Sequence, residues 1–142
     1  KTKPTISNAM DVSNPSNFIR IQKIFNNDLQ KIKKVIKGYS CNDQQTEEAI
    51  KDLYNKKSYI MDPHSAIGYL GLKNYLSNRA SDTNGIFLST AHPIKFKEHV
   101  EKSIGKEIAL PSRLNKIIDK EKSTIEINSY SDLKDQLLST VN

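Results

Sequence analysis

Three short polar stretches carry the side chains whose types and spacing suit chemistry. They are Ser7-Asn8-Ala9-Met10-Asp11, Asp62-Pro63-His64 and Ser89-Thr90-Ala91-His92. Each follows a segment that we expect to be a short strand and precedes one that we expect to begin a helix. The start of a helix presents free backbone N–H groups and the positive end of the helix dipole, which favour an anion. Together the three stretches predict a site for a small polar, anionic ligand.

Each of these side chains also has a purely structural interpretation. Asp62 can cap a helix, which is the better interpretation of that residue. His64 and His92 can be packed, hydrogen-bonded histidines, and Ser89 and Thr90 can satisfy backbone groups. The coincidence of three such turns at three strand ends favours a ligand site, because ligands bind at the carboxyl ends of strands in open parallel sheets. Periodicity does not name the ligand.

The elements that position these stretches alternate between strands and helices. Short runs predict strands at 5–8, 58–61 and 86–88. Apolar residues spaced by three or four predict helices, and polar residues predict their ends. We expect the first helix to be capped by Asn14, to break near Asn26-Asn27 and to end at Gly38. A second helix should start at 42 or 43, and a third should follow Asp62 over 65–76. A fourth should start at His92-Pro93, and a last one should be capped by Ser131.

This order predicts an α/β fold with a parallel sheet. Three strands are few for 142 residues, and such a sheet would have open edges. The segment 65–76 is apolar on nearly every side, which is typical of a helix buried between other elements. We therefore expect the chain to be part of something larger, with this helix buried against elements outside it.

Composition excludes several classes of function. The net charge is +6, from 22 basic and 16 acidic side chains, but the lysines are spread along the chain without interleaved aromatic residues, so we expect no nucleic-acid partner. There is no long apolar run, so we expect no membrane span. The single cysteine, Cys41, fits a reducing compartment and a cytoplasmic protein. The three histidines and this cysteine match no zinc motif, so we expect no metal.

Three motifs in order carry a resemblance to a known family. SNAMDVSNPSNF, DPHSAIGY and GIFLSTAHPIKFKEHVE resemble the C-terminal part of the threonine synthases, in the longer form found in enteric bacteria and yeast. The resemblance runs from about residue 4 to residue 114, and the tail beyond it is looser. Residues 7–10, which are spelled like the remnant of a cleaved tag, are therefore interpreted as native sequence.

The resemblance implies a fold, an activity and a cofactor. Threonine synthases are pyridoxal-phosphate (PLP) enzymes of fold type II, the tryptophan-synthase-β-like architecture. We therefore expect a helix-rich α/β chain with a few parallel strands. The implied reaction is the conversion of O-phospho-L-homoserine and water to L-threonine and phosphate by a carbon–oxygen lyase. Residues 1–142 would form the C-terminal portion of the PLP-binding catalytic region, with 105–142 as a looser helical tail.

The resemblance also assigns site residues. In this fold type a Ser or Thr hydroxyl faces the pyridine nitrogen of PLP, and the matching position is Thr90 within TAHP. Its neighbour Ser89 is the weaker candidate. Five further residues are expected in the vicinity of the site without assigned roles, namely Ser7, Asn8, Asp11, His64 and His92.

Two parts that the resemblance requires do not occur in these 142 residues. The lysine that holds PLP as a Schiff base lies in an SFKD-like segment upstream of SNAMDV in the family, and so does the loop that binds the cofactor phosphate. Lys97 superficially echoes that lysine but falls inside a predicted helix, where we expect a solvated surface lysine. We therefore expect this piece alone to be inactive and its partner to be the N-terminal part of the same enzyme.

Two alternatives stay open at this point. One is another fold type II enzyme that acts on a different amino acid, such as a dehydratase. The other is a small, basic, non-catalytic binding module that has kept the half-fold.

Overall fold

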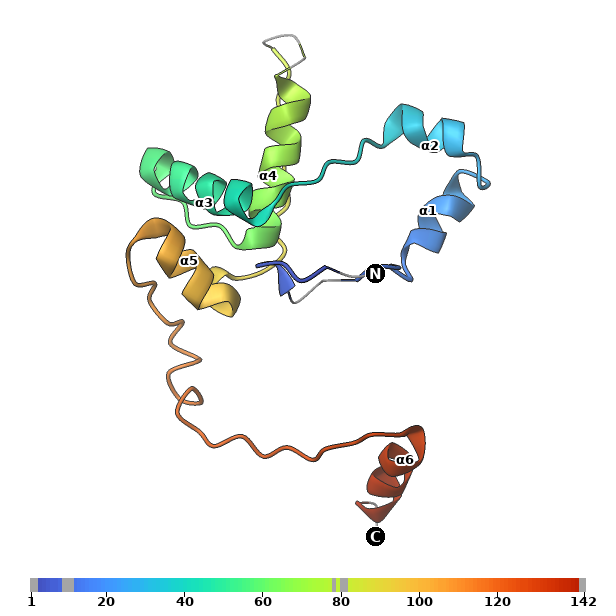
Figure 1. Ribbon diagram of the computed structural model, residues 1–142, viewed down its shortest axis with the longest axis vertical. Coiled ribbons are helices and arrows are strands. Elements are labelled where there is room, and N and C mark those ends of the chain that lie inside the picture. Colours follow the sequence, from blue (N-terminus) through green and yellow to red (C-terminus); the bar gives the residue numbers. More distant parts are fainter. Residues whose placement is uncertain (1–2, 9–11, 78, 80–81, 141–142) are drawn as a thin grey trace. The chain divides into compact units, whose positions relative to one another are not determined.

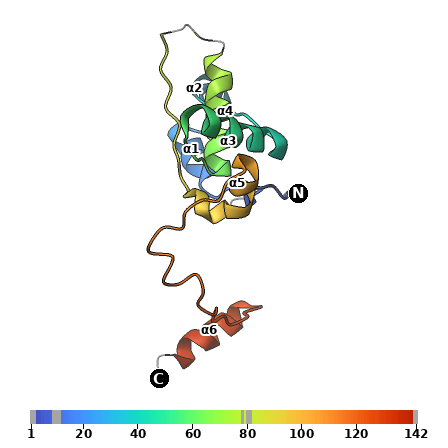
Figure 2. The same cartoon turned by 90° about the vertical axis from the view of Figure 1, so that its left-hand side faces the viewer.

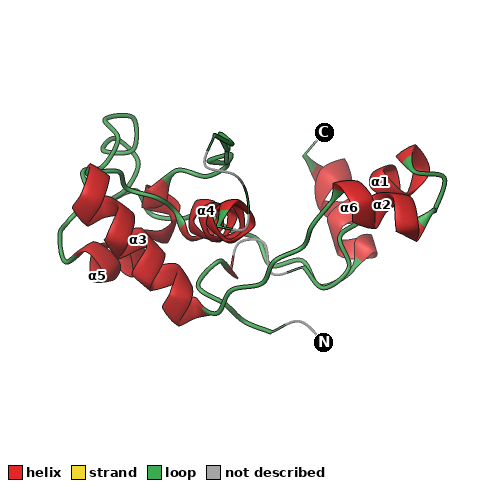
Figure 3. Cartoon of the chain, turned by 90° about the horizontal axis from the view of Figure 1, so that it is seen from above, coloured by secondary structure: helices red, strands yellow, loops and turns green. Residues whose placement is uncertain are grey.

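The computed structural model describes residues 3–8, 12–77, 79 and 82–140, which form two compact units, Lys1–Ala109 and Leu110–Asn142. All regular elements in these described ranges are helices (Figures 1 and 3). The helix-rich character is confirmed, but the few parallel strands are not, because none of the described residues is in a strand. Residues 6 and 7 form a turn, and the predicted strands at 58–61 and 86–88 have no neighbouring strand among the described residues with which to pair.

The first helical region is broken where the sequence predicts. Helix α1 (Phe18–Ile24) and helix α2 (Leu29–Val35) are separated by Asn26 and Asn27, whose φ angles are 52° and 57°. Asparagine tolerates this left-handed conformation better than most residues.

Both predicted ends of this region are wrong. Asn14 does not cap α1, because the carbonyl of Pro15 accepts from the N–H of Phe18 in a turn and Asn17 stands at the N-cap. Gly38 does not end α2, since Ile36 already leaves the helix in an extended conformation.

The next two helices begin as their polar residues predict. Helix α3 (Asp43–Lys57) starts with a capping box, in which Asn42 and Gln45 each accept from the other's backbone N–H. Helix α4 (Pro63–Leu76) has Asp62 as its N-cap and proline at its first position. Within α4, Gly68 and Lys73 are exposed in this chain by itself, so the burial of this helix against elements outside the chain stays a prediction.

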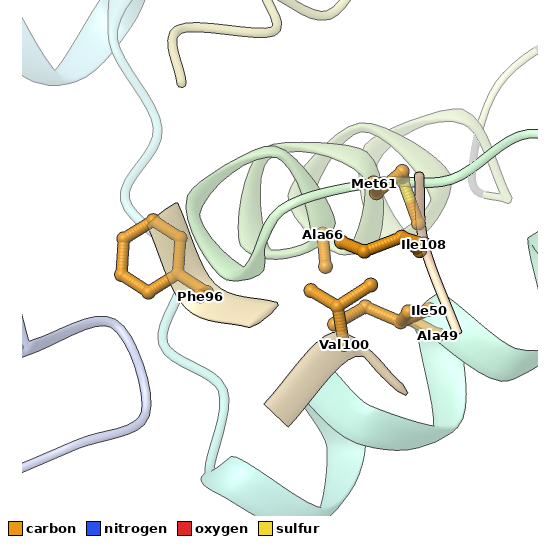
Figure 4. Packing of buried hydrophobic residues seen from close by; sticks show 7 residues of the cluster. All are labelled: Ala49, Ile50, Met61, Ala66, Phe96, Val100 and Ile108. Carbon is orange, nitrogen blue, oxygen red and sulfur yellow. The ribbon is translucent and has the colours of Figure 1, made fainter. Parts of the chain in front are cut away.

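The core of the first unit lies where α3, α4 and helix α5 (Lys97–Ile104) meet. α3 packs against both α4 and α5, and the 3-10 helix η2 (Pro93–Phe96) leads into α5 from the predicted start at His92-Pro93. Figure 4 shows the seven buried side chains of this cluster: Ala49, Ile50, Met61, Ala66, Phe96, Val100 and Ile108. On α3, Ile50 is fully buried in this cluster and Leu53 packs at its edge.

The segment 85–91 runs back along α4 toward the start of that helix (Figure 2). The Leu72 side chain lies over Gly85, the rings of Phe87 and Tyr69 meet edge to face at 5.7 Å, and the Ser89 and Ser65 hydroxyls are 3.0 Å apart. Odd-numbered residues of the segment therefore face α4. The intervening apolar residues, Ile86 and Leu88, are 88% and 76% exposed. This alternation is that of a β-strand, although no described strand lies beside it.

The second unit contains one described helix, α6 (Tyr130–Ser139). Its N-cap is Ser129 and not Ser131, because Ser129 and Asp132 form a capping box three residues apart. Among the described residues, none of the helices combines the length and hydrophobicity needed to cross a membrane.

The packing in Figure 4 predicts which isoleucine the first unit needs. Replacing the fully buried Ile50 with alanine should lower the free energy of unfolding by about 2–5 kcal/mol, because the helices close only partly around the cavity. Ile24→Ala on α1 is the matched control, since that side chain is 74% exposed, and should change it by no more than about 0.5 kcal/mol. Urea denaturation followed by circular dichroism measures both. Equal losses in the two variants would contradict this core.

The capping box of α6 predicts a dependence on pH. Hydrogen bonding from the Ser129 side chain, followed by that from the Asn128 backbone, lowers the pKa of Asp132 below its ordinary value of 3.8. The folded pKa lies below the unfolded one, so the carboxylate stabilises the helix above the unfolded pKa and this support is lost as the pH falls through the folded pKa. Chemical shifts of residues 129–139 should report less helix below about pH 4.

Asp132→Asn should remove this pH dependence, whereas Asp135→Asn, one turn further along α6, should preserve it. Identical titrations of the two variants would show that the capping box does not control the start of α6.

Candidate functional site

The buried carboxylate of Asp62 is the centre of the candidate site. Its side chain is fully buried at the start of α4. Oδ1 accepts from the backbone N–H groups of His64 at 2.9 Å and Ser65 at 3.4 Å, and it lies 3.2 Å from His64 Nδ1. The Ser65 hydroxyl donates to Oδ2. Four donors thus satisfy one carboxylate, which is what burying it requires.

His64 has one ring nitrogen bound and one open. Nδ1 faces the Asp62 carboxylate and so carries a proton, and in a neutral ring Nε2 then has the lone pair. The imidazole meets the Phe96 ring edge to face, with centroids 5.1 Å apart. Nε2 is buried and has no hydrogen-bond partner among the described residues. A buried acceptor in this state is suited to a polar group brought by a ligand or by another part of a protein.

The turn at 89–92 reaches the same place through Ser89. Its hydroxyl lies 3.0 Å from that of Ser65, which links the turn to Asp62. Thr90, the next residue, is exposed. His92 is also exposed, and its Nδ1 accepts from the N–H of Ile94 at 3.2 Å, so this histidine caps η2. Two of the three predicted stretches are therefore brought together.

Ser7 and Asn8, the described residues of the N-terminal stretch, take part in none of these contacts. Ser7 is buried, with its N–H donating to Thr5 Oγ1 at 3.1 Å, and its own hydroxyl has no partner within the described ranges. Asn8 is exposed and lines a hollow of about 230 Å³ with residues 94–99. Asp11 lies outside the described residues. The structure thus places Asn8 beside η2 and the start of α5.

Ser65 is the site residue that the sequence interpretation missed. It is fully buried and joins Asp62 to Ser89. A signal was present, because Ser65 stands three residues after the cap Asp62, the spacing at which a polar side chain answers an N-cap.

The structure shows where Lys97 lies and whether possible metal ligands come together. Lys97 is 46% exposed in α5 and lies 3.8 Å from Glu101, so its interpretation as a surface lysine is confirmed. In the part of the chain that the structure describes, no three side chains of the types His, Cys, Asp and Glu come close enough to hold a metal ion.

Comparisons with known proteins agree on one family. The family model described as "Threonine synthase, C-terminal" matches residues 65–136, half of the chain. The threonine synthase of Buchnera aphidicola subsp. Acyrthosiphon pisum is 44% identical over 97% of this chain and 31% of its own length. The crystal structure of threonine synthase from Escherichia coli superposes with a TM-score of 0.83, at 32% identity, over 98% of this chain and 32% of that one.

A third similarity concerns the fold alone. The structure of a PLP-bound threonine synthase from Brucella melitensis matches with a TM-score of 0.70 and 24% identity, over 96% of this chain and 34% of that one. The chain spans about a third of the length of each of these relatives. By its matching family model, this chain belongs to the threonine synthase family, as its C-terminal part.

Proposed function

We propose that this chain is the C-terminal part of a PLP-dependent threonine synthase of fold type II, a carbon–oxygen lyase. That enzyme converts O-phospho-L-homoserine and water to L-threonine and phosphate. The observation that carries the proposal is the contact between Ser65 and Ser89, which holds the TAHP turn against the start of α4. Membership of the family supports the reaction.

The residues present suit one side of a bound PLP. Thr90 is exposed, and its hydroxyl can donate to an unprotonated pyridine nitrogen. His64 Nε2 and Ser7 Oγ are buried polar atoms without partners among the described residues, as expected where a further polar group completes a site. When bound, PLP supplies an electron sink for the carbon chemistry. The chain contributes a pyridine contact and a structured wall around it.

The N-terminal part of the same enzyme is the proposed partner. It would supply the lysine that holds the cofactor and the loop that binds its phosphate. Ile86 and Leu88, which face away from α4, are the apolar side chains that such a partner would cover. A strand of that part beside 85–89 would give the parallel strands that this chain lacks in its described residues. The single cysteine of this chain leaves it without an internal disulfide, which supports a cytoplasmic location.

The proposal predicts a division of activity. The complete enzyme, in which this chain follows its N-terminal part, should release phosphate from O-phospho-L-homoserine when PLP is present. The 142-residue chain alone should release none, because the cofactor-holding lysine comes from the other part. A phosphate assay measures both. Release by the chain alone, or by neither protein, would contradict the proposal, and dehydration of serine in place of phosphate release would favour the dehydratase alternative.

The pyridine contact predicts a split between two substitutions of Thr90. Thr90→Val keeps the shape of the side chain and removes the donor. It should weaken PLP binding by the complete enzyme about 5- to 150-fold, because leaving a buried acceptor without its hydrogen bond costs about 1–3 kcal/mol. Thr90→Ser keeps the hydroxyl and should stay within about threefold of the original protein.

PLP titration followed by absorbance measures this affinity, and phosphate release measures turnover in parallel. Equal losses in the serine and valine variants would show that the Thr90 hydroxyl is not the contact.

A further inference from the structure

The segment 85–91 has one face toward α4 and one face away from it. The register of the segment against α4 determines which side chains lie on each face. Gly85, Phe87 and Ser89 each lie against a residue of α4, at Leu72, Tyr69 and Ser65 respectively. Ala91 continues this inner face by packing on the core. Ile86, Leu88 and Thr90 alternate with them. They are exposed, as Gly85 and Ser89 also are, so the contacts with α4 and not the exposure distinguish the two faces. Because side chains of an extended chain alternate, a slip of one residue would turn Thr90 toward α4 and Ser89 away from it.

One polar contact specifies this register. Gly85 and Phe87 meet α4 through apolar contacts, which are not directional and tolerate a shift better than a hydrogen bond does. Ser89 instead meets Ser65 through a hydroxyl pair at 3.0 Å. Ser65 is fully buried, so losing its match with Ser89 would change a buried polar contact.

The protons of this network have a fixed direction. A hydroxyl has one proton to donate, and the Ser65 proton goes to Asp62, since a carboxylate only accepts. The bond between Ser65 and Ser89 must then use the Ser89 proton. Ser89 is therefore unable to donate to a ligand at the same time, whereas Thr90 has its hydroxyl on the exposed face.

We infer that Ser65 and Ser89 are positioning residues that lock the register of 85–91, so that Thr90, and not Ser89, is presented to the cofactor. Asp62 determines which way these hydrogen bonds point, because its carboxylate accepts the hydrogen bond from the Ser65 hydroxyl. This inference rests on the proposed function. It adds a role for Ser65 and removes Ser89 from the residues that contact the cofactor.

A helix cap alone does not account for the arrangement. Asp62 already accepts from two backbone N–H groups, which satisfies the start of α4 without any serine hydroxyl. The hydrogen bond between the Ser65 and Ser89 hydroxyls adds nothing to that cap. It does connect the helix start to the residue beside Thr90.

The test compares Ser65→Ala in two backgrounds of the complete enzyme, the original protein and Thr90→Val. In the original background, PLP affinity should fall about fivefold, which corresponds to about 1 kcal/mol for one hydrogen bond. In the Thr90→Val background the same change should cost less than about twofold, because Ser65 acts through the Thr90 hydroxyl. PLP titration by absorbance gives the affinities, and the melting temperature of the cofactor-free protein reports stability separately.

Two further variants keep the test decisive. Ser89→Ala alters an exposed residue, so the protein should fold, and its effect should equal that of Ser65→Ala without adding to it in the double variant. Ser103→Ala removes a half-buried hydroxyl that donates to the His99 carbonyl in α5, and it should leave PLP affinity within about twofold.

The outcomes separate the inference from the proposed function. If the original complete enzyme binds no PLP, the proposed function itself is wrong. If it binds PLP and releases phosphate while Ser65→Ala and Ser89→Ala leave the affinity unchanged, the register lock alone is wrong. An equal loss from Ser65→Ala with and without the Thr90 hydroxyl would also overturn the lock, since it would show a general structural role.

Discussion

A fully buried carboxylate must be surrounded by donors, and this requirement organises the first unit around Asp62. The donors all come from the first turn of α4, from the backbone of residues 64 and 65 and from the side chains of His64 and Ser65. Satisfying Asp62 therefore fixes where α4 begins and how those two side chains point. Through Ser65 the same requirement reaches Ser89, 24 residues further along the chain.

The core complements this polar network from the other side. Met61 and Ala66, which flank the Asp62 cap in sequence, pack with Ile50 of α3 and Val100 of α5. Their burial excludes water from the start of α4, which strengthens the hydrogen bonds to the carboxylate and makes an unpaired group there costly. The buried core residues therefore stabilise both the helix packing and the adjacent polar site.

Local signals predicted much of this arrangement, and non-local ones did not. Asn42 and Asp62 start helices because an N-cap needs only its own side chain and the next three residues. Asn14 and Ser131 carry the same kind of signal three and two residues away from the caps actually used, because several polar residues compete near each start. The predicted strands did not form because a strand needs a neighbouring strand to pair with. A short apolar run such as 86–88 does not reveal whether that neighbour lies in the same 142 residues. Ser65 was missed because its role requires Ser89 to be adjacent in space.

The apolar neighbours of Thr90 on the outer face of 85–91 would strengthen a hydrogen bond made by its hydroxyl. Ile86 and Leu88 precede it on that face and are apolar. Once a partner covers such a face, a single hydroxyl lies in a medium of low dielectric, where a hydrogen bond is stronger than in water. A hydroxyl can meet an unprotonated ring nitrogen there without introducing a charge, whereas a carboxylate would have to be buried with its own set of donors, as Asp62 is. The same cost of burial explains the four donors around Asp62 and, under the proposed function, accounts for a neutral side chain at Thr90.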